Sequence, residues 1–327
     1  MTNQADSKKR LRRRLFHEAL ICLALFGVPA LVLYPYTHWR PAAEFHARVR
    51  TRELKFTVGQ EGYKGRGLFA GGRADLVFEH FDRIKLPSGQ EIKGRRISFR
   101  NVRFQALPLG AVTQIVLQWE PGKPAGLSIS ASYEAAPPSP VTVFWDKDSQ
   151  AGSDSGPLTT TSDGNADIYP APNVALKMSL DPRSDDPKKP GELIFDSSYP
   201  VYLSTSAPVL FTQRSGSAIL GFENVVDVLN AGRKQKVLQS QSLQIADLGA
   251  DARISDLRIR KDGMTVDVQG TAGALAVDGR DIRPSPVEYL RSNGILSTWV
   301  TTSLLIGTAA LTVATRFGLV KLLGKGG

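Results

Sequence analysis

The stretch RISDLRIRKDGMTVDVQG, residues 253–270, predicts a β-hairpin. Apolar and polar residues alternate on both sides of Asp262-Gly263, a dipeptide that favours a tight two-residue turn. The apolar positions that lead into and out of this turn are Ile254, Leu257, Ile259, Met264, Val266 and Val268. A period of two residues is typical of strands with one buried face, so the hairpin predicts a β-rich fold.

The same period recurs through much of the chain from about residue 52 onward. It is clearest in ELKFTVG, RADLVFEHF, RRISFRNVRF, TQIVLQWE, GLSISASYE and VTVFWD. Many short strands separated by Gly, Pro and Ser indicate a sandwich or barrel. Residues 219–234 fit either a helix or a strand followed by a turn.

Two polar segments predict long loops. Residues 147–165 are rich in Ser, Gly, Thr and Asp, and residues 181–191 are charged and rich in proline. Such compositions are typical of loops and linkers. We take the second segment as a boundary between a larger β domain, residues 37–185, and a smaller one, residues 186–290.

Two uncharged stretches predict membrane-spanning helices. Ala19 to Tyr36 has no charged side chain over 18 residues, and Ile295 to Ala314 has none over 20. About 20 apolar residues are needed to cross the hydrocarbon core of a bilayer. The sequence therefore predicts transmembrane helices over residues 15–36 and 295–315, with short basic tails at 1–14 and 316–327.

The distribution of charge gives these helices an orientation. The net charge is +10, but residues 1–16 contribute +5 and residues 316–327 contribute +3, so the remainder is close to neutral. Basic flanks at both ends place both termini in the cytoplasm by the positive-inside rule, and residues 37–294 on the opposite, periplasmic side. Because the charge is concentrated beside the apolar stretches, no nucleic-acid partner is expected.

The single cysteine, Cys22, lies in the first apolar stretch, so the long segment between the two predicted helices has no cysteine and cannot form a disulfide. Exported proteins without disulfides are more typical of a bacterial envelope than of a eukaryotic surface. The predicted fold class is thus a membrane-anchored, mainly-β protein of the bacterial inner membrane. Its two transmembrane helices flank a large extracytoplasmic β-sandwich-like region.

A basic segment provides the clearest candidate binding site. Residues 83–103 carry seven basic side chains against Glu91 alone. If Ile97 and Phe99 face the core, Arg96 and Arg100 project from the other face of the strand. The predicted ligand-binding residues for an anionic patch are Lys93, Arg95, Arg96, Arg100 and Arg103. Such a patch would bind phosphate-bearing membrane lipid or an anionic polysaccharide, and the alternative is a solvated sheet face with acids interleaved among the arginines.

Small residues in the predicted membrane helices indicate a packing surface. Ser303 and Gly307 are four residues apart, Ala310 and Ala314 continue the pattern, and Gly27 lies in the first helix. Small residues at this spacing let helices approach closely in lipid. The partner would be the other helix or another membrane protein subunit.

Three sequence motifs partly match known catalytic, cofactor or metal sites but lack features that those sites require. Gly65-x-Gly67 is followed by further glycines and a β pattern, not by the helix that a dinucleotide loop needs. Asp146, Asp148 and Asp154 have spacings similar to those of a calcium loop, but the required glycine is displaced and Pro157 occupies position twelve, so the pattern fails. His80 beside carboxylates is better explained as a structural strand residue, so no catalytic, cofactor or metal residues are assigned.

These features predict a non-enzymatic accessory or scaffold subunit of a cell-envelope complex, whose β domain binds a partner protein or an anionic envelope polymer or lipid. Two alternatives remain open. One is a membrane-tethered hydrolase acting on envelope glycans through carboxylates such as Glu79 or Asp82. The other is a two-span channel subunit, for which the threonines of residues 295–314 would line the pore.

Overall fold

The structure is a computed structural model that divides the chain into two compact units. One unit is residues 42–283, and the other is residues 1–41 with 284–327. The structure describes residues 40–59, 73–94, 96–104, 114–119, 127–133, 140–153, 156–158, 163–171, 174–183, 192–194, 200–212, 224–238, 240–260, 263–298, 301, 302 and 305.

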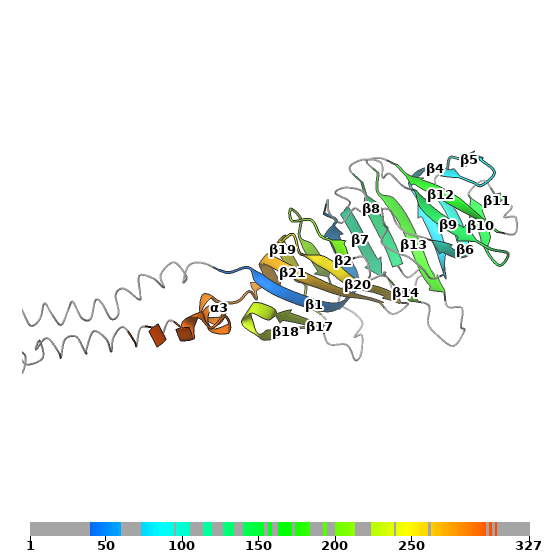
Figure 1. Cartoon of the computed structure of the whole chain (residues 1–327). Coiled ribbons are helices and arrows are strands. Elements are labelled where there is room, and N and C mark those ends of the chain that lie inside the picture. The colour runs from blue at the N-terminus through cyan, green and yellow to red at the C-terminus, as the bar shows by residue number, and fades with distance from the viewer. Residues whose placement is uncertain are drawn as a thin grey trace, which may run out of the picture. The chain divides into compact units, whose positions relative to one another are not determined.

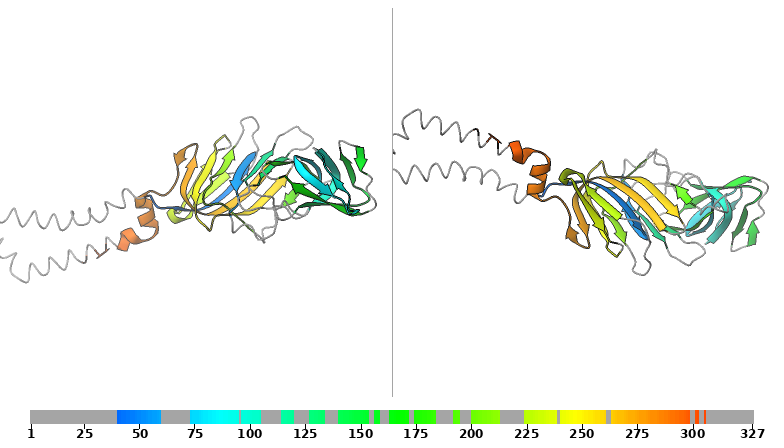
Figure 2. Two further views of the ribbon diagram at one scale, coloured as in Figure 1. Left: turned by 90° about the horizontal axis from the view of Figure 1, so that it is seen from above. Right: turned by 90° about the horizontal axis from the view of Figure 1, so that it is seen from below.

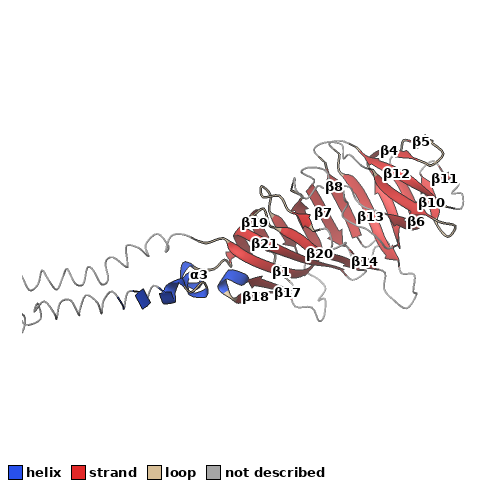
Figure 3. Cartoon of the chain, in the orientation of Figure 1, coloured by secondary structure: helices blue, strands red, loops and turns tan. Residues whose placement is uncertain are grey.

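The predicted mainly-β character is confirmed. Figure 3 shows that the described part of the chain is almost entirely strand. All strand pairings in the described part are antiparallel and belong to one continuous sheet. The hairpin of residues 253–270 forms as predicted, from β20 (Arg253–Arg260) and β21 (Gly263–Val277). A bulge between Ile254 and Asp256 accounts for the break in alternation before Leu257, which is buried like Ile254.

The sheet closes on itself in a first ring. Its strands are β1 (Ala43–Thr51), β2 (Glu53–Thr57), β16 (Val209–Thr212), β19 (Leu243–Leu248), β20 and β21. β21 pairs with β1 on one side and with β19 and β20 on the other, while β16 bridges β19 and β2. Since β1 and β2 are separated by one residue, the ring is closed by a single bent strand.

The bend between β1 and β2 is at Arg52. The buried Thr51 hydroxyl donates to the carbonyl of Glu53 (2.7 Å) and lies 3.2 Å from that of Thr212 across the ring. The backbone N–H of Trp119 donates to the Arg52 carbonyl (2.7 Å), and the Arg52 guanidinium lies 5.4 Å from the centre of the Trp119 ring. A corner of this kind lets one strand take part in two layers of a folded sheet.

A second ring repeats this pairing with other strands. It consists of β3 (Arg73–Glu79), β4 (Phe81–Lys85), β6 (Arg96–Phe104), β9 (Val141–Trp145), β10 (Gln150–Ser153) and β12 (Gly164–Pro170). β6 pairs with β3 and with β9 and β10, and β12 bridges β9 and β4. The bend is at His80, whose φ of 64° lies in the left-handed region. The order along the chain differs, because β6 precedes β9 whereas β21 follows β19.

Three strands join the rings, and short strands extend them. β7 (Gln114–Trp119), β8 (Leu127–Ser132) and β13 (Leu176–Arg183) connect β2 to β3. Figures 1 and 2 show the first ring, with its blue, yellow and orange strands, and the second, in cyan and green, at opposite ends of the unit of residues 42–283. The added strands are β5 (Glu91–Ile92), β11 (Gly156–Leu158), β14 (Glu192–Ile194), β15 (Val201–Tyr202), β17 (Asn224–Val228), β18 (Arg233–Val237) and β22 (Arg280–Asp281).

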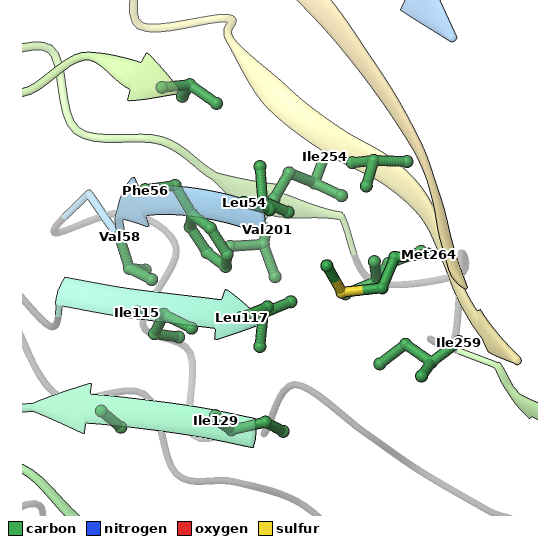
Figure 4. Close-up of a cluster of buried hydrophobic side chains, with 14 of the residues drawn as sticks. Leu54, Phe56, Val58, Ile115, Leu117, Ile129, Val201, Ile254, Ile259 and Met264 are labelled. Atoms are coloured by element: carbon green, nitrogen blue, oxygen red, sulfur yellow. The ribbon is translucent and has the colours of Figure 1, made fainter. Parts of the chain in front are cut away.

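The core of this unit lies between the layers of the folded sheet. Figure 4 shows Leu54 and Phe56 of β2 and Leu117 of β7 pointing toward Ile254 of β20 and Met264 of β21. All five side chains are fully buried. Burying a residue of this size contributes about 1.5–3 kcal/mol, so alternate residues of each strand hold the layers together.

The structure tests two predictions made from local sequence pattern, for residues 219–234 and for residues 147–165. Residues 219–234 contain no helix longer than η3 (Leu229–Ala231) in their described part, so the strand-and-turn alternative is the right one. Leu229, which a helical face would bury, is 58% exposed. The predicted loop 147–165 is wrong in part, because it contains β10 and β11. Residues 184–191, around the predicted domain boundary, lie outside the described residues, so the boundary stays a prediction.

The predicted transmembrane helices are the main correction. In the described residues no helix is long and apolar enough to cross a membrane. The helix α3 (Pro286–Ser292) has seven residues, a rise of about 10 Å against the roughly 30 Å of a bilayer core. It begins at a capping box of Ser285 and Glu288, with Pro286 in its first turn. The uncharged length on which the prediction rested does not by itself establish a spanning helix.

The parts of the prediction that depended on those helices are corrected with them. The span at 15–36 lies wholly outside the described residues, as does most of the span at 295–315. The absence of a membrane-spanning helix from the described residues overturns four predictions: a fold class with two flanking transmembrane helices, an inner-membrane location, cytoplasmic termini and a periplasmic middle segment. What stands is the mainly-β unit of residues 42–283.

Candidate functional site

The predicted anionic patch lies mostly on β6 of the second ring. Ile97 and Phe99 are buried while Arg96 and Arg100 are exposed, so the two arginines project from the outer face as the alternation predicts. Lys93, just before β6, is also exposed. Arg95 and the helix-packing candidates Gly27, Ser303, Gly307, Ala310 and Ala314 lie outside the described residues.

A bulge brings Arg103 to the same outer face. Asn101 has a φ of 56°, and its N–H donates to Asp75 Oδ1 (2.9 Å) on β3. Two residues of β6 here oppose one residue of β3, which shifts the alternation by one position. As a result Val102 is buried and Arg103 is exposed, three residues after Arg100.

The strand register places Arg103 in a row that crosses the sheet. Arg183 of β13 pairs with Arg73 of β3, and Arg73 pairs with Arg103. Arg103 in turn pairs with Phe144 of β9, which pairs with Asn165 of β12. Directly opposite residues of antiparallel strands share a face, so all five side chains lie on one outer surface.

Two arginines of this row already hold carboxylates. Arg183 forms an ion pair with Asp75, and Arg73 donates to Asp146 Oδ2 (2.5 Å) and to the Asn101 carbonyl (3.2 Å). Among the described residues Arg103 has no carboxylate partner. Of the three arginines in this row, Arg103 is therefore the one available to an external anion.

The carboxylates beside the row are strongly engaged. The Arg73 hydrogen bond, helped by the Asp148 N–H and the Ser149 hydroxyl, outweighs desolvation and lowers the pKa of Asp146 to about 2. Burial raises the pKa of Asp75, but hydrogen bonds from Arg183 and the Asn101 N–H outweigh burial, and the net pKa is lowered. Both carboxylates are thus fully committed to partners other than Arg103.

Acids interleave with the arginines at the other end of β6. Glu79 lies 3.6 Å from Arg96, and Lys177 of β13 is in register with Glu79. Both members of the Arg96 pair are substantially exposed, so this contact is weak. We call the outward cations of β3, β6 and β13 the basic face; they are Arg73, Arg96, Arg100, Arg103, Lys177 and Arg183.

An exposed aromatic side chain borders the basic face. Phe144 is 42% exposed, whereas its chain neighbours Val143 and Trp145 are buried. The aromatic side chains of Phe78, Phe99 and Trp145 pack against one another in the core of the second ring of strands. Phe99 and Trp145 are stacked with 6.3 Å between their ring centroids. Phe144 is therefore an outward residue of a strand whose core positions are already filled.

A polar cluster on the first ring could not be found from sequence. The buried Asp267 of β21 accepts from His46 Nε2 (2.5 Å) and Ser255 Oγ (3.1 Å) at one oxygen, and from Arg48 Nε (3.2 Å) and Nη2 (3.1 Å) at the other. Serine and histidine both bind the carboxylate and not each other, so the serine is not activated as a nucleophile. His46 and Asp267 are 221 positions apart, and only the β1–β21 register brings them together.

The carboxylates considered for hydrolysis are not brought together as an acid pair. Glu79 lies beside Arg96 and Asp82 beside Arg83 (3.8 Å), each at the surface. His80, at the bend between β3 and β4, is exposed. The described residues contain no group of three or more His, Cys, Asp or Glu side chains that could hold a metal ion.

The fold and this surface define an antiparallel β protein with a cationic outer face and an exposed aromatic residue beside it. No protein-family model, curated protein or solved structure matches the chain.

Proposed function

We propose that the chain is a non-enzymatic binding protein whose basic face binds an anionic polymer. The observation that carries this proposal is the imbalance of charge on one sheet surface. Asp75, Asp146 and Glu79 are held by three arginines, and a fourth carboxylate, Asp181 of β13, lies beside Arg183 on the same face, so six cations face four carboxylates. Arg100, Arg103 and Lys177 remain without an ion pair to a described residue.

A polymer suits this surface better than a small anion. The unpaired cations lie on two strands separated by β3, so they are spread over the width of three strands. Exposed cations on a sheet face attract an extended chain of negative charges, and arginine can contact carboxylate or phosphate through two parallel hydrogen bonds. Because such contacts are screened by salt, binding should weaken as ionic strength rises.

The test is a comparison of two charge-matched double variants of the full chain. Arg100→Ala with Arg103→Ala removes two cations from the basic face. Lys234→Ala with Lys236→Ala removes two exposed cations from β18, beside the first ring. Binding of polygalacturonate and of polyphosphate is measured by calorimetry at low and at physiological salt.

We expect the first variant to raise the dissociation constant about tenfold, because each exposed charge contact contributes up to about 1 kcal/mol. The β18 variant should bind within about twofold of the unaltered chain. Equal losses in both variants would mean that binding reflects net charge alone. Absence of binding to either polyanion would refute the proposal.

A further inference from the structure

The neighbours of Phe144 indicate which class of anionic polymer the surface fits. Phe144 is flanked in register by Arg103 on β6 and Asn165 on β12. Neighbouring strands are about 4.8 Å apart, so the three side chains span about 10 Å across the sheet. This length is comparable to that of two linked sugar rings.

The chemistry of the three side chains is mixed. Arg103 presents a guanidinium that can bind a carboxylate with two parallel hydrogen bonds. Phe144 presents an aromatic face, which carries partial negative charge and attracts the slightly positive C–H groups of a sugar ring. Asn165 carries both a donor and an acceptor suited to hydroxyl groups.

The acids around these three side chains have other partners. The carboxylates nearest to Arg103 are occupied, because Asp75 is bound by Arg183 and Asp146 by Arg73. Asp167 lies two residues after Asn165 on β12 and accepts a hydrogen bond from the Thr142 hydroxyl (2.8 Å), so this carboxylate also has a partner. An incoming carboxylate therefore competes with no described acid for Arg103.

We propose that Arg103, Phe144 and Asn165 form a binding platform for an acidic polysaccharide, with a uronate carboxylate on Arg103 and the adjoining sugar ring stacked on Phe144. This inference rests on the proposed function and narrows its ligand. A polyphosphate chain offers the charge but has no C–H face to stack, and a neutral glucan offers the face but not the charge. Only a polymer with both features uses the whole platform.

The experiment uses the full chain and three polymers of different chemistry. Polygalacturonate carries charge and sugar faces, polyphosphate carries charge alone, and dextran carries sugar faces alone. Each is titrated against the unaltered chain, Phe144→Ala and Arg103→Ala. Thermal unfolding of each variant is recorded first, and because Phe144 is outward-facing, we expect its replacement to leave the fold intact.

The expected result is selective. Phe144→Ala should weaken polygalacturonate binding at least fivefold and leave polyphosphate binding within about twofold, whereas Arg103→Ala should weaken both. Phe144→Leu, which keeps an apolar side chain without an aromatic face, should behave like the alanine variant. Dextran should bind to none of the three proteins.

Other outcomes separate this inference from the function it rests on. If both polyanions bind through Arg103 but neither depends on Phe144, the platform is wrong while the binding function stands. If an oligothymidylate binds more tightly than polygalacturonate and loses affinity in Phe144→Ala, the aromatic face stacks on bases and the polysaccharide assignment is overturned. If no polyanion binds to the unaltered chain, both proposals fail.

Discussion

In the first ring, the carboxylate of Asp267 draws its partners from the neighbouring strands β1 and β20, whereas in the second ring Arg103 has no described carboxylate and lies beside an exposed phenylalanine. The two rings share their strand pairing. They differ at these two charged groups. Asp267 is satisfied by neighbouring strands and stabilises the first ring, whereas Arg103, unlike the paired Arg73 of the second ring, is left available for a ligand.

This contrast predicts that substitutions in the first ring lower stability and that substitutions around Arg103 lower binding. The largest effect is expected at Gly270 on β21, in the first ring. Its φ is 146°, and a Cβ there would lie 2.4 Å from Ala252 Cα. Gly270→Ala should therefore lower the free energy of unfolding by at least about 3 kcal/mol.

Gly152 on β10 provides the matched control in the second ring. A Cβ at this position would meet only the Ser98 hydroxyl, at an ordinary 3.5 Å. Gly152→Ala should change the free energy of unfolding by less than about 1 kcal/mol, measured by urea titration. Similar losses in both variants would contradict the close contact between Gly270 and Ala252.

A smaller loss is expected when the carboxylate of the first ring is removed. Asp267→Ala leaves His46 and Arg48 without their shared acceptor and should cost about 2 kcal/mol of stability. Asp256→Ala, which removes an exposed partner of Arg258, should cost less than about 0.5 kcal/mol. Polyanion binding should be unchanged in both, and a loss of binding in Asp267→Ala would show that the two outer faces are not independent.

Several elements of this fold could be predicted from the sequence because their pattern is local. The hairpin of residues 253–270 and the outward direction of Arg96 and Arg100 both follow from alternation along a single strand. The strand β10 could not be predicted, since Gly152 and Ser153 have no apolar period and pair with β6 through the backbone. A length of uncharged residues predicted membrane helices that the described residues do not contain.

The candidate site was predictable only in part for the same reason. Composition located the basic segment, but the row of Arg183, Arg73, Arg103, Phe144 and Asn165 depends on the register of five strands. The Asn101 bulge turns Arg103 outward by interrupting the alternation of apolar and polar residues. The end of a strand interrupts the alternation in the same way, so the sequence alone does not identify the bulge. Register between distant strands is set by the whole core, so single-strand patterns do not contain it.

Two arginines that are neighbours in the second ring, Arg73 and Arg103, should differ in their contribution to stability. Arg73→Ala removes the partner of Asp146 and a hydrogen bond to the Asn101 carbonyl, so the melting temperature should fall by about 2–4 °C. Arg103→Ala removes no described ion pair and should leave the melting temperature within about 1 °C. If Arg103→Ala proved as destabilising as Arg73→Ala, Arg103 would be a structural residue and not a free ligand-binding one.

The smallest effect is expected from acid titration of the same row. The pKa of Asp146 is lowered from 3.8 to about 2 by the hydrogen bond from Arg73, so its ionised form stabilises the folded state. That stabilisation is fully present above the ordinary pKa and is lost as the pH falls from about 4 toward 2. Asp146→Asn should therefore melt below the unaltered chain at neutral pH, and the difference should narrow over this acid range. A difference in melting temperature that stayed constant with pH would mean that the Asp146 charge is not coupled to folding, and that Arg73 is no more committed than Arg103.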